Sequence, residues 1–102
     1  MFVNIVEFPN IKKGRDKEFI AWFRWSNRVY SQFEGFISRR LLKSTKGKRR
    51  YVAIVEHKNE KTFMTMHLSK QRQNAWLRVD PLFKGSPKPR FYKTVVASKI
   101  RQ

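Results

Sequence analysis

Residues 49–68, RRYVAIVEHKNEKTFMTMHL, decide the fold of this chain. Residues 51–55 form an almost unbroken apolar run rich in β-branched side chains, which predicts a strand over residues 49–57. Because a strand with one solvated face would alternate polar and apolar residues, this strand needs cover on both faces. Asn59 can cap a helix over residues 60–68, since its side-chain oxygen can accept a bond from a free N–H of the first turn. The stretch therefore predicts a strand-to-helix junction in a small α+β domain.

The remaining elements follow from the same periodicities. Apolar residues at i, i+3, i+4 spacing predict a long helix over residues 15–33, and a further helical segment begins at Ser69 and ends near Pro81. Residues 85–89, GSPKP, predict a loop. Three other strands are expected, over residues 2–8, 36–44 and 90–98. The resulting order, β-α-β-β-α-β, is ferredoxin-like: a four-stranded antiparallel sheet with helices on one face. We expect residues 1–102 to form one domain.

One face of this sheet has no helix to cover it, yet the side chains assigned to it are mostly apolar. They are Val3, Ile5, Val52, Ile54 and Val96. A large exposed apolar patch is unusual on a monomeric protein. A second copy packed face to face would cover the patch, so the sequence predicts a homodimer that forms a dimeric α/β barrel.

The chain is strongly basic, with 24 Lys and Arg against 7 Asp and Glu and a formal net charge of +17. Such a balance favours a polyanionic partner. However, the basic residues are spread over the whole chain apart from a cluster within residues 46–50, and no known nucleic-acid-binding module is present. We therefore expect any nucleic-acid binding to be non-specific and sensitive to salt.

The sequence also bears on compartment and on redox chemistry. No apolar run approaches the roughly 20 residues that span a bilayer. The N-terminal sequence MFVNIVEF lacks the basic start and long apolar stretch of a signal peptide, so we expect a cytoplasmic protein without membrane attachment. There are no cysteines, which excludes disulfides and thiolate metal ligands.

Few residues are available for chemistry. Only His57 and His67 titrate near neutral pH. His57 ends the predicted strand and is expected to be exposed, whereas His67 shares a helix face with Phe63. No spacing of His, Asp and Glu resembles a metal site, and no Ser-His-Asp set, P-loop or GxGxxG motif is present.

A mostly apolar cavity between the helices and the sheet is the most plausible site. Asn4 points to the helix-covered side of the first strand, because it shares that side with Phe2 and Phe8. Asn4 and His67 are the candidate catalytic residues. Apolar pockets with one or two converging polar groups are typical of small-molecule sites. The candidate substrate-binding residues are Trp22, Phe23, Trp25, Met66 and Trp76. The alternative for each aromatic residue is a place in the ordinary core.

The whole pattern resembles a known family. An Asn in the first strand, "EGFISRRLLKS" after a long helix, "RYVAIVEHKNEKTF" and a final "FYKTVV" occur in the order and spacing of the antibiotic-biosynthesis monooxygenase superfamily. The resemblance extends over residues 2–97. It implies a ferredoxin-like fold, a face-to-face dimer and a cavity in each subunit. Some members of that superfamily oxidise aromatic polyketides with dioxygen and no cofactor, and one branch binds and degrades haem.

The haem branch implies three residues: an Asn on the first strand, a Trp on the second helical region and a His as axial ligand. Asn4 matches the first. Met66 stands where the Trp is expected and Ala75 where the His is expected, while His67 and Trp76 lie one position beyond them. One step along a helix turns a side chain by about 100°. The resemblance therefore favours a cofactor-free enzyme over a haem enzyme.

The leading hypothesis is a dimeric monooxygenase of this superfamily that acts on a planar aromatic or apolar small molecule without a cofactor. Asn4 would form a hydrogen bond to the substrate and His67 would handle a proton. One alternative is a haem-binding and haem-degrading monooxygenase. The other is a non-catalytic protein that uses the same fold to bind a ligand or a polyanion.

Overall fold

Residues 1–47 and 50–98, the part of the chain that the computed structural model describes, form four strands and three α-helices. In chain order the elements are β1 (Phe2–Glu7), α1 (Asp16–Tyr30), β2 (Phe36–Lys43), β3 (Tyr51–His57), α2 (Glu60–His67), α3 (Lys70–Val79), the 3-10 helix η1 (Asp80–Leu82) and β4 (Lys88–Lys93). This is the element order that the sequence predicts.

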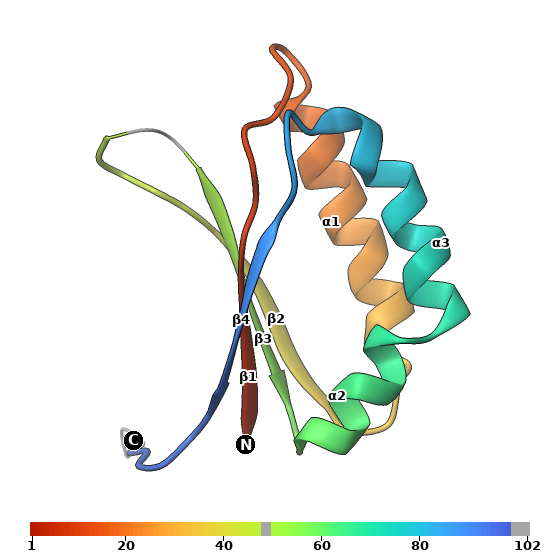
Figure 1. The fold of residues 1–102 in the computed structure, drawn as a ribbon, viewed down its shortest axis with the longest axis vertical. Helices are drawn as coiled ribbons and strands as arrows, with labels where there is room; N and C mark the ends of the chain where they lie inside the picture. Colours follow the sequence, from red (N-terminus) through yellow and green to blue (C-terminus); the bar gives the residue numbers. More distant parts are fainter. Residues whose placement is uncertain (48–49, 99–102) are drawn as a thin grey trace.

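The strands form one antiparallel sheet in the order β2-β3-β1-β4. Asn4 lies in the middle of the sheet, opposite Val55 of β3 on one side and Phe91 of β4 on the other. The three helices all lie on one side of the sheet (Figure 1). The ferredoxin-like α+β prediction is confirmed, and the sheet has one face without helical cover.

Side-chain caps fix where α2 and α3 begin. The Asn59 Oδ1 atom accepts a bond from the Thr62 N–H at 2.8 Å, as the sequence predicts. The Ser69 Oγ atom accepts from the Arg72 N–H at 3.1 Å in the same way. Each bond satisfies a first-turn N–H that has no partner within the helix. The chain therefore divides its second helical region into two helices that meet at Ser69.

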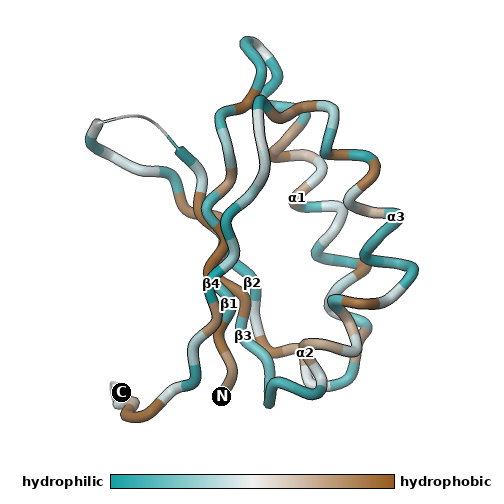
Figure 2. The backbone as a smooth tube through the Cα atoms, in the orientation of Figure 1, coloured by the Kyte–Doolittle hydropathy of each residue, from teal (hydrophilic) through white to brown (hydrophobic). Residues whose placement is uncertain are grey.

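The core lies between the sheet and the helices. One group of buried side chains surrounds Phe19 of α1, and a second surrounds Phe63 of α2. Figure 2 shows apolar positions recurring along the sheet and along the helices, as expected for elements that bury one side. The indole N–H of Trp22 donates to the Ala75 carbonyl at 2.8 Å and so joins α1 to α3. This arrangement places both helices over the face of the sheet that carries Asn4.

The last strand differs from the prediction. It comprises residues 88–93 rather than 90–98, because Val6 pairs with Pro89, a residue that the sequence assigned to a loop. Proline is tolerated here because β4 is an outer strand and pairs on one side only. The predicted dimer face therefore loses Val96, which lies beyond the strand and is 88% exposed. The long helix also ends earlier than predicted, at Tyr30.

Within residues 1–47 and 50–98, no helix combines the length and the apolar character needed to cross a bilayer. Two sequence features lie outside the described residues. They are Lys48 and Arg49 of the basic cluster, and the predicted C-terminal tail at residues 99–102.

Candidate functional site

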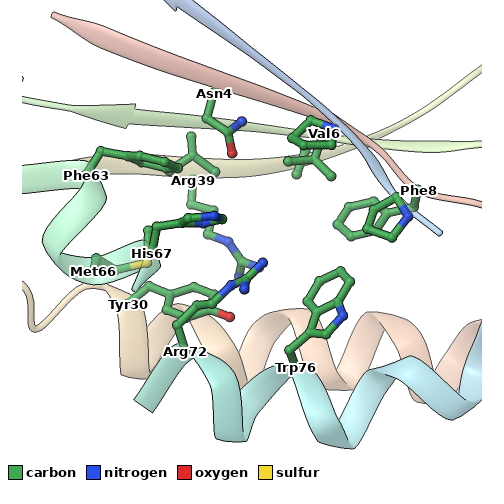
Figure 3. Close-up of a pocket in the computed structure, with 14 residues that line it drawn as sticks. Asn4, Val6, Phe8, Tyr30, Arg39, Phe63, Met66, His67, Arg72 and Trp76 are labelled. Atoms are coloured by element: carbon green, nitrogen blue, oxygen red, sulfur yellow. The ribbon is translucent and has the colours of Figure 1, made fainter. Parts of the chain in front are cut away.

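A cavity of about 80 Å³ lies between the sheet and the helices. Each helix and two of the strands contribute a polar residue to its lining: Asn4 from β1, Tyr30 from α1, Arg39 from β2, His67 from α2 and Arg72 from α3. The rest of its lining is apolar. Figure 3 shows Asn4 extending from the sheet toward the helices, and His67 and Trp76 extending from the helices toward the sheet.

The side chain of Asn4 is held by one hydrogen bond through its amide nitrogen, which leaves its amide oxygen available to a ligand. Its Nδ2 atom donates to the Arg90 carbonyl of β4 at 3.1 Å. The amide oxygen points toward the helices (Figure 3). Because the side chain is 5% exposed, an acceptor in this position would need a partner from inside the cavity. Asn4 can therefore accept a hydrogen bond from a bound hydroxyl group.

His67 is the last residue of α2, and its ring stacks on Phe63 with the centroids 5.4 Å apart. Burial lowers the pKa of His67 from its ordinary value of 6.5, and the positive charge of Arg72 lowers it further. The imidazole is therefore neutral at neutral pH. A neutral imidazole beside a cavity can accept a proton from a bound molecule.

Arg39 is a largely buried cation. Its Nη1 atom donates to the Ser26 Oγ at 2.6 Å, the Asn27 Oδ1 at 2.8 Å and the Phe23 carbonyl at 3.3 Å. Its Cζ atom lies 3.8 Å from the ring centre of Phe23 and 4.5 Å from that of Tyr30. Burial lowers the pKa of Arg39 to about 10, so the group stays charged at neutral pH.

Tyr30 lies next to both arginines. Burial raises the pKa of its hydroxyl group, while the charges of Arg39 and Arg72 act in the opposite direction. Both guanidinium groups are thus close enough to influence the Tyr30 oxygen. Because the net effect is an increase, the phenol keeps its proton at neutral pH and can donate a hydrogen bond.

Residues 1–78 match the family model described as "antibiotic biosynthesis monooxygenase". The chain belongs to the antibiotic biosynthesis monooxygenase family. The resemblance in the sequence is thereby confirmed. A search of curated proteins finds no match.

Several solved structures share the fold of this family member. A proposed antibiotic biosynthesis monooxygenase from Nitrosomonas europaea is 18% identical, with a TM-score of 0.80, and the alignment covers 94% of this chain and 100% of that one. For a proposed antibiotic biosynthesis monooxygenase from Deinococcus radiodurans, the identity is 11%, the TM-score 0.84 and the coverage 100% of both chains. SnoaB from Streptomyces nogalater, a cofactor-independent oxygenase, is 17% identical, with a TM-score of 0.74 over 94% of this chain and 92% of that one.

The cavity of this family member contains some of the residues predicted for it and lacks others. Asn4, Met66, His67 and Trp76 all line it. Three predicted substrate-binding residues do not: Trp22, Phe23 and Trp25. Trp22 uses its N–H to hold α3, Phe23 packs against the Arg39 guanidinium, and Trp25 lies beneath Arg78 with the Arg78 Cζ 4.1 Å from its ring centre.

His57 is buried, and the prediction that it is exposed is wrong. Alternation along β3 places it on the same face as Tyr51 and Val55, against the helices. Its Nδ1 atom lies 3.0 Å from the Thr62 Oγ1, whose own proton is donated to the Asn59 carbonyl at 3.1 Å. The Nδ1 atom is therefore the donor. His57 is outside the cavity and connects β3 to α2.

The sequence pattern does not predict three of the polar residues that line the cavity, which are Tyr30, Arg39 and Arg72. For Arg39 a signal existed, since its alternation with Leu41 assigns it to the helix-covered face of β2. Arg72 has no such signal, because a long cationic side chain near a helix start ordinarily extends into solvent.

The cavity does not fit a haem group. Its volume of about 80 Å³ is well below the roughly 300–1,000 Å³ of sites that hold drug-sized ligands. Ala75, which stands at the expected axial-ligand position of the haem branch, is fully buried between α1 and α3. Among the described residues, no group of three or more His, Cys, Asp or Glu side chains is placed to hold a metal ion.

Proposed function

We propose that this family member is a cofactor-independent monooxygenase that oxidises a small aromatic molecule bound in the cavity. The family supplies the reaction class, and SnoaB is a cofactor-independent oxygenase of the same fold. The observation that carries the proposal is the position of His67, a neutral base beside an apolar cavity that also contains the Asn4 amide oxygen. A proton acceptor and a hydrogen-bonding group are what such a reaction requires from the protein.

The substrate itself reduces dioxygen in this reaction. His67 accepts a proton from the CH₂ carbon of the keto form of a phenol, and the resulting carbanion transfers one electron to dioxygen. The two radicals combine to form a C–O bond, and His67 returns its proton to the distal peroxide oxygen. Loss of water breaks the O–O bond, so the CH₂ group and O₂ become C=O and H₂O. The carbon supplies all four electrons, and no external reductant is consumed.

The size of the cavity limits the substrate. About 80 Å³ suits a ligand with one ring rather than several, and even one ring requires the lining side chains to move apart. Arg72 and Met66 have long flexible side chains that can make this adjustment. A dihydroxybenzene such as hydroquinone is therefore the appropriate first substrate to test.

The test is oxygen uptake with hydroquinone and isotopically labelled dioxygen. We expect one O₂ to be consumed per hydroquinone, with one labelled atom in a hydroxyquinone product and the other in water. Uncatalysed oxidation would instead convert dioxygen to hydrogen peroxide without labelling the ring. Binding of hydroquinone with no uptake above the buffer rate would contradict the proposal and favour a non-catalytic binding protein.

We also propose that the protein is a homodimer joined through the uncovered face of the sheet. Val3, Ile5, Val52 and Ile54 are neighbours on this face and are only partly buried in the single chain. Figure 1 shows all three helices on the other side of the sheet. A second copy packed against this face would remove these side chains from water, at roughly 25 cal/mol per Å² of apolar area.

Replacing Ile54 with lysine is expected to convert the dimer to monomer or to insoluble protein, because an unpaired charge would be buried in the interface. Sedimentation velocity measures the change. Leu77→Lys is the matched control, since Leu77 is 71% exposed on α3, on the helix side of the molecule. An Ile54→Lys variant that sediments as the wild-type dimer would contradict this interface.

A further inference from the structure

The charges that line the cavity are all positive. Arg39 of β2 and Arg72 of α3 face it, and among the described residues no Asp or Glu does. The other lining elements contribute uncharged groups: Asn4 of β1, Tyr30 of α1, Val55 of β3, neutral His67 of α2 and Pro89 of β4. A buried cation is costly unless an anion or several acceptors accompany it. The lining of the cavity therefore contains two positive charges and no negative charge to balance them.

The hydrogen bonds of Arg39 leave much of its guanidinium unused. All three bonds recorded for it within the described residues involve Nη1, while Nε and Nη2 have none. A guanidinium has five N–H donors, and the Nε–Nη2 edge is the one suited to an oxyanion. The buried partnerless atoms of the described chain belong to Arg50 and His57, so this edge of Arg39 is not sealed by protein. Ring contacts with Phe23 and Tyr30 stabilise the cation but accept none of these protons.

Arg72 adds a second positive charge, at a position where it destabilises the protein unless an anion is bound. It lies in the first turn of α3, where a cation opposes the helix dipole, and that turn contains no acidic residue. Its Cζ atom lies 5.3 Å from the ring centre of Trp76, which also lines the cavity. The charges of both arginines act on the Tyr30 hydroxyl group, and the Arg39 Cζ atom lies 4.5 Å from the centre of the Tyr30 ring. An anion placed there would offset the cost of both charges.

We propose that Arg39 and Arg72 form an oxyanion subsite, and that the aromatic ligand binds with a phenolate oxygen between these two residues and the Tyr30 hydroxyl. This inference rests on the proposed function, because it names the ionic form of that substrate. A phenolate is favoured over the neutral phenol, since an opposite charge within about 4–6 Å stabilises the ionised form. Removal of the CH₂ proton of the keto form by His67 produces this same anion, whose charge is shared between the oxygen and the ring carbon, and it is the form that gives an electron to dioxygen.

The experiment uses para-nitrophenol, which binds without reacting with dioxygen and whose ionised form has its own visible absorption. Titrating the saturated protein with acid gives the pKa of the bound phenol directly. We expect that pKa to lie about 1 to 3 units below its value in water, so the phenolate binds about 10- to 1,000-fold more tightly than the phenol. In Arg39→Met most of this lowering of the pKa is expected to disappear, while Arg24→Met keeps it. Arg24 is an exposed residue of α1 that does not line the cavity, and each variant loses one positive charge.

Arg72→Met provides an independent test, because Arg72 makes no side-chain hydrogen bond recorded within the described residues and its loss leaves the core intact. In this variant the pKa of bound para-nitrophenol is expected to be lowered by less than in the wild-type protein. A bound phenol with an unchanged pKa in the wild-type protein would overturn the proposal. So would tight binding of benzoate with no shift for para-nitrophenol, which would assign the subsite to a carboxylate. None of these measurements depends on oxygen uptake. A protein that lowers the pKa of bound para-nitrophenol but consumes no dioxygen would therefore retain the subsite and lose the proposed function.

Discussion

Replacing His67 with alanine is expected to reduce the turnover of hydroquinone about 10²- to 10⁴-fold, the usual contribution of a positioned general acid–base residue. The loss should appear in kcat more than in KM, because the imidazole transfers a proton and contributes little contact area. Initial rates of oxygen uptake measure it. Leu68→Ala is the matched control, since Leu68 follows His67 directly and is 66% exposed. A His67→Ala variant with wild-type kcat would show that another group accepts the proton.

The pH profile of the wild-type enzyme checks the same assignment. A general base must be deprotonated, so the rate falls as the pH falls through its pKa. Burial and the charge of Arg72 place the pKa of His67 below 6.5. We therefore expect full activity through neutral pH and a loss only in acid. His67→Ala should have no such acid limb, whereas an Arg72→Met variant should show the limb at higher pH because one depressing charge is gone.

Replacing Gly35 with alanine is expected to lower the free energy of unfolding by about 2 to 5 kcal/mol. Gly35 has φ of +83°, a region that costs an L-residue about 1–2 kcal/mol. A Cβ atom there would also overlap the Thr62 side chain, whose Cβ lies 2.5 Å away. Thr62 has little freedom to move, since its Oγ1 bonds to the Asn59 carbonyl and to His57. Overpacking of this kind costs about 1–3 kcal/mol.

Urea denaturation measures the effect, and Gly14→Ala separates its two causes. Gly14 has a similar φ of +78° but no neighbouring atom within 4 Å of the added Cβ. The control should therefore lose only the backbone part, about 1–2 kcal/mol. Equal losses in the two variants would show that the contact with Thr62 is relieved at little cost.

The elements that the sequence predicts well are those with a local physical cause. The strand at residues 51–55, the cap at Asn59 and the start of a helix at Ser69 depend on near neighbours, and the structure has them where expected. The last strand was misplaced because Pro89 favours a loop locally. Pairing with β1 decides its position instead, and that pairing joins residues more than 80 positions apart. Such long-range pairing cannot be deduced from local preference.

In the candidate site too, local patterns predict some residues, and long-range packing determines others. Asn4 was assigned to the cavity by alternation along one strand, and His67 by its helical spacing from Phe63; the structure brings both to one cavity. Their catalytic roles remain predictions. Arg39 is different, because its significance comes from the rings and acceptors of α1 that surround it. Alternation along β2 assigns Arg39 to the helix-covered face, but no motif in a basic chain reveals that this arginine lies there without a carboxylate.

The high positive charge affects how copies of this protein can associate through the outer strands of the sheet. The two outer strands, β2 and β4, leave backbone N–H and C=O groups unpaired at the margins of the sheet, where another chain could add and start a fibril. β2 contains Arg39, Arg40 and Lys43, β4 contains Lys88, Arg90 and Lys93, and neither strand contains an acid. Margin-to-margin pairing would place these like charges on strands about 5 Å apart. Repulsion between these charges then opposes the growth of fibrils but does not oppose face-to-face association. Because salt screens this repulsion, aggregation should accelerate as ionic strength rises.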